Sequence, residues 1–183
     1  MSVLDDKQYF TDQSLYNLYP INKSVKKEDM EYINILLNSK VLDFYFNKKI
    51  ITNPDVFPYI KGVHIKSLPI RINSFFNSTF SLFSNALQYK KKQAIIDVSN
   101  ALVFELYFPD HMKDNDIDIL MFVKEDIEKT MQNRDFEKLN NQEKEKVIEQ
   151  LCKIWSNPNN EVVKRMGMFR EKSPDLLGVI LDS

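Results

Sequence analysis

The chain has 183 residues and a formal net charge of -1, with 43% hydrophobic and 28% charged residues. Its length suits one domain or two small ones, and its composition is that of a globular protein with a real core. Because the net charge is close to zero, the whole chain does not attract nucleic acid, and DNA binding would need a local basic patch. One cysteine, Cys152, excludes an internal disulfide and a cysteine zinc cluster.

The first ten residues are polar and charged, which is not the pattern of a secretory signal. No apolar run approaches the roughly 20 residues that are needed to cross a bilayer. We therefore expect a cytoplasmic protein with no membrane partner. Cys152 lies in an apolar helical pattern, so we expect it to be a buried thiol.

The N-terminal segments are predicted to contain strands and one long helix. Ser2–Leu4 reads as a strand, and Tyr9–Tyr19 as a strand pair that closes at Pro20. Met30–Phe46 predicts a helix with Ser24 as its N-cap, because apolar residues recur at helical spacing. Apolar groups lie on most sides of this helix, so we expect it to be buried between two layers. Its main apolar face is Ile33, Leu36, Leu37, Val41, Phe44 and Tyr45.

The segment after this helix is predicted to be extended. Asn53-Pro54 and Phe57-Pro58 interrupt regular structure. Apolar residues then alternate with polar ones, which favours a half-buried strand, and Pro69 indicates an edge strand or the end of a strand. The alternating residues are Val63, Ile65, Leu68, Ile70 and Ile72.

Two stretches of this region together resemble a known family. YINILLNSKVLDFYFNKKI, followed by FPYIKGVHIKSLPIRI, resembles the end of the TaqI-like C-terminal specificity domain. That domain occurs in adenine-specific DNA methyltransferases and in fused restriction–modification enzymes, and type I specificity subunits have a related pattern. Arg71 stands where the family usually has a second proline. The matching residues are Leu37, Asn38, Ser39 and Lys40, then Leu68, Pro69 and Ile70.

The rest of the chain is predicted to be helical. Helices are expected over Asn77–Leu87, Ala94–Phe108 and Ile117–Met131, with Pro109 ending the second. A capping box at Asn140 and Glu143 begins an amphipathic helix that stops at Asn157-Pro158. Short helices follow over Glu161–Met166 and, after Ser173 as N-cap, over Pro174–Leu181.

A second motif strengthens the family resemblance. FSLFSNALQYKKKQAIIDVSNALVFELYF resembles the helical tail that follows the specificity domain in the fused enzymes. The matching residues are Ile96, Asp97, Leu102, Val103, Phe104, Glu105, Leu106 and Tyr107. We therefore predict an α+β fold, with the C-terminal half of a target-recognition domain in residues 1–73 and a helical region in residues 74–183. The half-sheet would leave an open edge, which we expect to be covered by the C-terminal helices or paired with a second copy as a homodimer.

The sequence lacks the motifs of a catalytic or cofactor site. Its three glycines are isolated, so no glycine-rich loop can hold a dinucleotide. Asn53-Pro54 is not followed by the second proline and aromatic residue of an Asn-Pro-Pro-Tyr motif. His64 and His111 have no spacing with acidic residues that indicates a metal site. We predict no catalytic, cofactor-binding or metal-binding residues in this chain.

Basic residues beside aromatic ones are the candidate DNA contacts. They follow the apolar helix and occupy the predicted loop and strand, where lysines would neutralise phosphates and other side chains would read base edges. The alternative is that they are ordinary solvated charges, which is the favoured interpretation of Lys90–Lys92. Phe75, Phe76, Phe80 and Phe83 recur at helical spacing and are predicted to pack in the core. The candidates are Lys48, Lys49, Tyr59, Lys61, His64, Lys66 and Arg71.

The resemblance implies a non-catalytic DNA-recognition fragment of a bacterial restriction–modification protein. Its partners would be double-stranded DNA and a methyltransferase or nuclease domain or subunit. S-adenosylmethionine would bind in that catalytic domain. One alternative is a helical module that docks the specificity domain onto the catalytic domain. Another is that the chain is part of an active adenine-specific methyltransferase.

Overall fold

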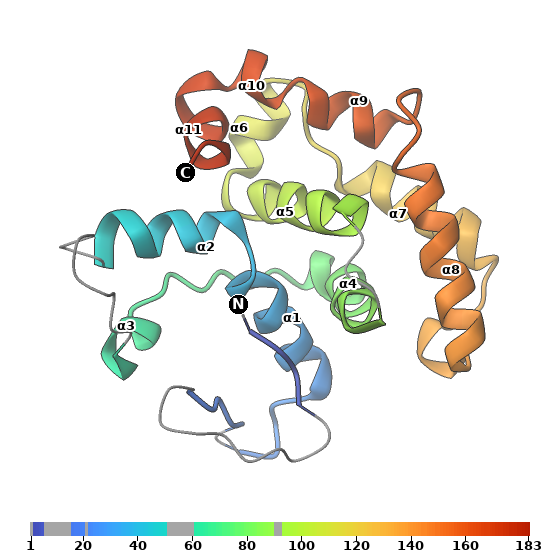
Figure 1. Ribbon diagram of the computed structural model, residues 1–183, viewed down its shortest axis with the longest axis horizontal. Helices are drawn as coiled ribbons and strands as arrows, with labels where there is room; N and C mark the ends of the chain where they lie inside the picture. The colour runs from blue at the N-terminus through green and yellow to red at the C-terminus, as the bar shows by residue number, and fades with distance from the viewer. Residues whose placement is uncertain (1, 6–15, 21, 51–60, 90–92) are drawn as a thin grey trace.

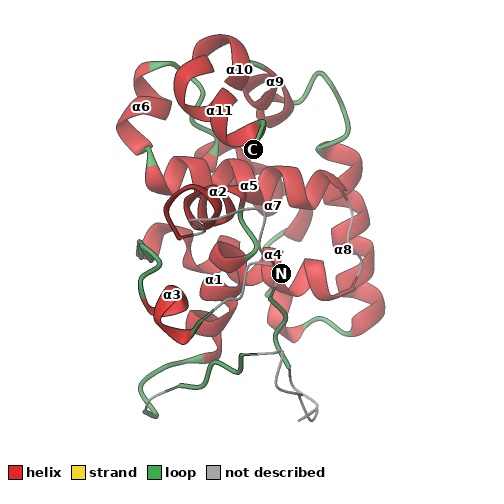
Figure 2. Ribbon diagram, turned by 60° about the vertical axis from the view of Figure 1, so that its left-hand side comes forward, coloured by secondary structure: helices red, strands yellow, loops and turns green. Residues whose placement is uncertain are grey.

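The computed structural model describes residues 2–5, 16–20, 22–50, 61–89 and 93–183, and over these ranges its regular structure is entirely helical (Figures 1 and 2). The α-helices are α1 (Lys27–Leu37), α2 (Lys40–Tyr45), α3 (Gly62–Lys66), α4 (Asn77–Tyr89), α5 (Gln93–Tyr107), α6 (Pro109–Asp114), α7 (Leu120–Met131), α8 (Asn141–Ile154), α9 (Glu161–Gly167), α10 (Phe169–Lys172) and α11 (Val179–Leu181). The 3-10 helices are η2 (Ser74–Phe76) and η3 (Phe136–Lys138), and the π-helices are η1 (Phe46–Ile50) and η4 (Pro174–Gly178).

Helix α5 is the centre of the molecule. It lies between α1 and α4 on one side and the C-terminal helices on the other (Figure 1). Eight of its residues are buried and seven of these are apolar, as expected for a helix that several partners contact. Helix α1 packs along α4, so one core joins the N-terminal and C-terminal parts of the chain. The predicted boundary near residue 73 falls at Asn73, the N-cap of η2, and the division into two domains stays a prediction.

The predicted α+β fold is wrong. The described residues contain no strand, so there is also no sheet edge for the predicted homodimer. Ser2–Leu4 is irregular, and most of Tyr9–Tyr19 lies outside the described residues. The alternating apolar residues that predicted a strand instead begin with α3, a helix of five residues. Pro69 follows in an irregular segment. The described residues contain no neighbouring strand with which this segment could form backbone hydrogen bonds.

The predicted long helix, Met30–Phe46, is broken in two. Ser39 has an extended backbone (φ -86°, ψ 149°), and its hydroxyl accepts a hydrogen bond from the Leu42 amide at 3.3 Å. It therefore begins a new helix, α2, immediately after α1 ends. Ser24 is not the N-cap of α1, because that position is Lys26. The prediction that the segment is buried is confirmed in part: Tyr32, Ile35, Leu36, Val41 and Leu42 are all less than 9% exposed, whereas the other four residues of the predicted apolar face are only half-buried.

The C-terminal helices agree with the sequence pattern. Helices α4, α5, α7, α8 and α9 lie within a few residues of their predicted ranges. Asn140 and Glu143 form the predicted capping box, and the Ser173 hydroxyl accepts a hydrogen bond from the Leu177 amide. Pro109 follows the end of α5 and is also the first residue of α6, where a missing amide hydrogen does no harm. Among the described helices, none is long and apolar enough to span a bilayer.

Glu105 on α5 holds the start of α7. Its carboxylate accepts hydrogen bonds from the amides of Ile119 (2.6 Å) and Leu120 (2.8 Å). Burial raises the pKa of this carboxyl above its ordinary value of 4.5, although the two amide hydrogen bonds oppose the shift. The folded protein therefore binds more protons here than the unfolded chain, and the contribution of Glu105 to stability falls as pH rises above about 4.5.

Substitution of Glu105 by glutamine tests this pH dependence. Glutamine keeps an acceptor oxygen but does not titrate, so the wild type should gain stability relative to Glu105→Gln as the pH falls from 7 towards 4.5. Urea unfolding of both proteins at a series of pH values measures the difference. A difference that is constant with pH, or that shrinks on acidification, would contradict the raised pKa.

Candidate nucleic-acid interface

The structure places four of the predicted DNA contacts on or next to two neighbouring elements, η1 and α3. Lys48 and Lys49 lie in the last turn of η1, while Lys61 is the N-cap of α3 and Lys66 is its last residue. The rings of Phe46 and His64 meet edge to face, with centroids 6.3 Å apart, so η1 and α3 lie side by side. We call Lys48, Lys49, Lys61 and Lys66 the basic rim.

The side chains of the basic rim are free to meet a ligand. All four residues are exposed, and none forms an ion pair within the part of the chain that the structure describes. Residues 44–72 contain five lysines and arginines but one acidic residue, Asp55, in a chain whose total charge is -1. The local excess of positive charge is the kind of patch that a near-neutral protein needs in order to bind phosphates.

His64 and Arg71 have roles within the fold. The Nδ1 atom of His64 accepts a hydrogen bond from the Lys61 amide at 3.2 Å, which caps α3. The Nη1 atom of Arg71 donates to the Tyr107 carbonyl at 3.0 Å, and the Tyr107 hydroxyl donates to the Pro69 carbonyl at 2.6 Å. Arg71 is exposed, yet its guanidinium is hydrogen-bonded to the last residue of α5 and so fixes the segment around Pro69 and Arg71 against this helix. Tyr59 lies outside the described residues.

The Leu-Asn-Ser-Lys motif ties distant parts of the chain together. Asn38 pairs with the Ser2 backbone, accepting from its amide at 2.9 Å and donating to its carbonyl at 3.0 Å. The Lys40 ammonium donates a hydrogen bond to the Leu181 carbonyl at 3.2 Å. The backbone amide of Lys40 donates to the Oδ1 atom of Asn100 at 2.8 Å. The motif residues therefore connect the junction of α1 and α2 to distant segments and are not part of the basic rim. Their roles were missed because the partners lie 36 to 141 residues away.

Residues 1–70 match the family model of the TaqI-like C-terminal specificity domain. The match confirms the resemblance, and it spans all four lysines of the basic rim. It ends before α4, so the likeness of the later helices to the tail of the fused enzymes stays a prediction. Searches of curated proteins and of solved structures returned no match.

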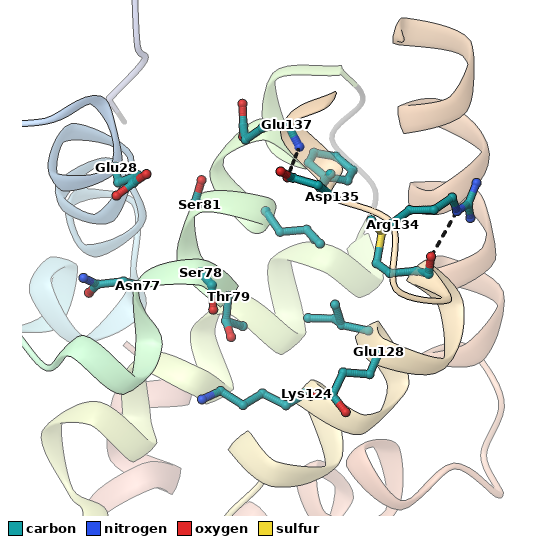
Figure 3. A pocket seen from close by; sticks show the side chains of 14 residues that line it. Glu28, Asn77, Ser78, Thr79, Ser81, Lys124, Glu128, Arg134, Asp135 and Glu137 are labelled. Carbon is teal, nitrogen blue, oxygen red and sulfur yellow. Dashed lines mark hydrogen bonds between the residues drawn. The ribbon is translucent and has the colours of Figure 1, made fainter. Parts of the chain in front are cut away.

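One hollow of the described surface is not suited to DNA. It measures about 560 Å³ and lies between α4, α7 and η3 (Figure 3). Glu28, Glu128, Asp135 and Glu137 line it, and their carboxylates repel phosphate. The Arg134 guanidinium donates to the carbonyl at the end of α7 at 3.0 Å, which occupies one of the basic groups there. No cluster of three or more metal-ligating side chains is found among the described residues.

Proposed function

We propose that this chain is a DNA target-recognition fragment, in which the basic rim binds the phosphates of a duplex. The observation that carries the proposal is the match of residues 1–70 to a specificity domain. The unpaired lysines of the rim support it, since ammonium groups without a protein partner can replace the counterions of DNA. Such contacts would set the register of the protein on the duplex, and base-reading side chains would set specificity.

The chemistry of methylation or cleavage would be supplied by a catalytic domain or subunit. In this arrangement the helices from α4 onward hold the rim and offer a surface for that partner. S-adenosylmethionine would bind to the catalytic partner, with no cofactor contact from the residues of the rim. His64 and Arg71 would position the rim, and a contact of either one with DNA is a further part of the proposal.

The salt dependence of DNA binding tests the proposal. Replacing all four lysines of the rim by alanine should lower the affinity for duplex DNA and reduce the slope of log K against log salt by about 0.9 for each phosphate that is no longer neutralised. Fluorescence anisotropy with a labelled duplex, at several salt concentrations, measures both quantities. The control replaces four exposed lysines on α7, η3 and α8, namely Lys129, Lys138, Lys146 and Lys153, of which the first two form ion pairs with Glu125 and Asp135. Equal losses of affinity in the two variants would count against the rim.

A second function is favoured by exposed apolar side chains. Ile72, Phe75 and Met121 are each about 70% exposed. They would suit a helical module that docks the specificity domain onto a catalytic domain. Docking of this kind depends on apolar burial and should change little with salt, whereas phosphate binding must weaken steeply as salt rises.

A further inference from the structure

A hollow of about 320 Å³ lies where α2, the end of α5 and the C-terminal helices meet. Its walls include four aromatic rings, Phe44, Tyr45, Tyr107 and Phe108, together with Pro69. Figures 1 and 2 both show α2 beside α5 and α11, which are the elements that enclose it. The size is at the low end of the range for small-ligand pockets.

The four rings are only half-buried, although the neighbouring core is closed. Phe104 and Leu106, in the turn of α5 just before Tyr107, are 1% and 2% exposed. The side chains of α5 therefore change from fully buried to half-buried where the helix reaches the hollow. Half-exposed aromatic rings next to basic groups are the arrangement by which proteins hold unstacked nucleotide bases, because every base has an apolar face that stacks on a ring.

The hollow lies close to the basic rim along the chain. Tyr45 ends α2, and Lys48 and Lys49 follow it closely in η1. Another wall of the hollow is formed by Pro69, two residues before Arg71. The Arg71 guanidinium donates a hydrogen bond to the Tyr107 carbonyl at 3.0 Å. A DNA backbone held by these cations would therefore pass the mouth of the hollow.

One polar group at the edge of the hollow indicates which bases would fit. Asp175 lines the hollow, is exposed, and forms no ion pair or hydrogen bond through its side chain within the part of the chain that the structure describes. An ionised carboxylate only accepts hydrogen bonds, so it suits the exocyclic amino group of adenine, cytosine or guanine. Thymine offers carbonyl oxygens there, which the carboxylate would repel.

We propose that this aromatic hollow holds a single unstacked base bearing an amino group, from DNA bound at the basic rim. The inference rests on the proposed function, because the cations of the rim deliver the strand. In this arrangement Tyr45 and Tyr107 supply ring faces, Asp175 accepts from the amino group, and Arg71 holds the wall together while it faces the backbone.

Duplexes with one unpaired base test the inference with the whole chain. An unpaired base needs no energy for extrusion, so a duplex with a single adenine bulge should bind roughly ten-fold or more tightly than the fully paired duplex. A thymine bulge, which has the same flexibility without the amino group, should show a much smaller gain. Fluorescence anisotropy at constant salt measures all three affinities.

Two variants assign the effect to the hollow. Tyr45→Leu keeps an apolar side chain but loses the ring face, so the preference for the adenine bulge should fall several-fold while binding to the paired duplex is unchanged. Asp175→Asn should reduce the discrimination between adenine and thymine. The matched control is Phe75→Leu, at an aromatic residue that is 69% exposed and lies outside the hollow. Circular dichroism confirms that each variant is folded.

The outcomes separate this inference from the proposed function. Salt-dependent binding to the paired duplex, without any preference for the adenine bulge, overturns the inference that the hollow holds a base and leaves the proposed DNA binding by the basic rim standing. A preference that Tyr45→Leu changes no more than Phe75→Leu also overturns the hollow. Absence of binding to all three duplexes overturns both proposals.

Discussion

Replacing Phe83 by alanine is expected to lower the free energy of unfolding by about 3–5 kcal/mol. Phe83 lies on α4, is fully buried, and stacks on Trp155 at the end of α8, with ring centroids 5.3 Å apart and planes at 19°. Alanine would remove this stacking and leave a cavity between α4 and α8. Both helices are anchored elsewhere, so the cavity can collapse only in part.

Thermal and urea unfolding measure the fall in stability. For a chain of this length, 3–5 kcal/mol corresponds to a fall in Tm of roughly 6–20 °C. The control is Phe75→Ala, eight residues earlier, where the ring is 69% exposed and contacts the Lys124 ammonium 5.6 Å from its centroid. That variant should lose less than about 1 kcal/mol. Similar losses at the two positions would show that α4 does not pack as described.

Replacing Asn85 by leucine should cost about 2–4 kcal/mol, because it removes a donor from a buried carboxylate. Glu31 on α1 is 1% exposed and accepts hydrogen bonds from the Asn85 amide at 2.9 Å and from the Ser81 hydroxyl, both on α4. The Lys27 ammonium lies 3.1 Å from it. Leucine fills the space of asparagine but leaves the carboxylate with one donor fewer.

A double-mutant cycle separates this pairing from packing. Glu31→Met removes the charge, so the variant with both Glu31→Met and Asn85→Leu has an apolar pair of similar volume. Its loss of stability should be smaller than the sum of the two single losses by about 1–3 kcal/mol. Urea unfolding with a fitted slope for each variant gives the four energies. Strictly additive losses would contradict a direct contact between α1 and α4 through these groups.

The helices from α4 onward were predictable because their signals are local. Phe80, Phe83 and Leu87 repeat at helical spacing, and the capping box at Asn140 and Glu143 marks the start of α8. The pattern fails at Phe75. This residue was predicted to pack in the core but is exposed, because it lies in the 3-10 helix η2, whose three-residue turn changes the direction of its side chains.

The N-terminal errors also have physical causes. The alternation from Val63 to Ile72 suits a strand only if another strand supplies hydrogen bonds, and the described residues offer none. A short helix satisfies its own backbone, so the first part became α3. The break at Ser39 was hidden by apolar residues on both sides, although a serine followed by Asp43 in the first turn of α2 is a helix-start signal.

The sequence by itself determined the resemblance to the specificity domain, the amphipathic helices and the basic residues that follow the first apolar helix, because each depends on neighbouring residues. Only the tertiary structure decided that Asn38 holds Ser2, that Lys40 holds Leu181, and that Arg71 is bonded to the end of α5. These hydrogen bonds join residues far apart in the chain, and bonds of that kind form only when packing of the core has placed donor and acceptor together.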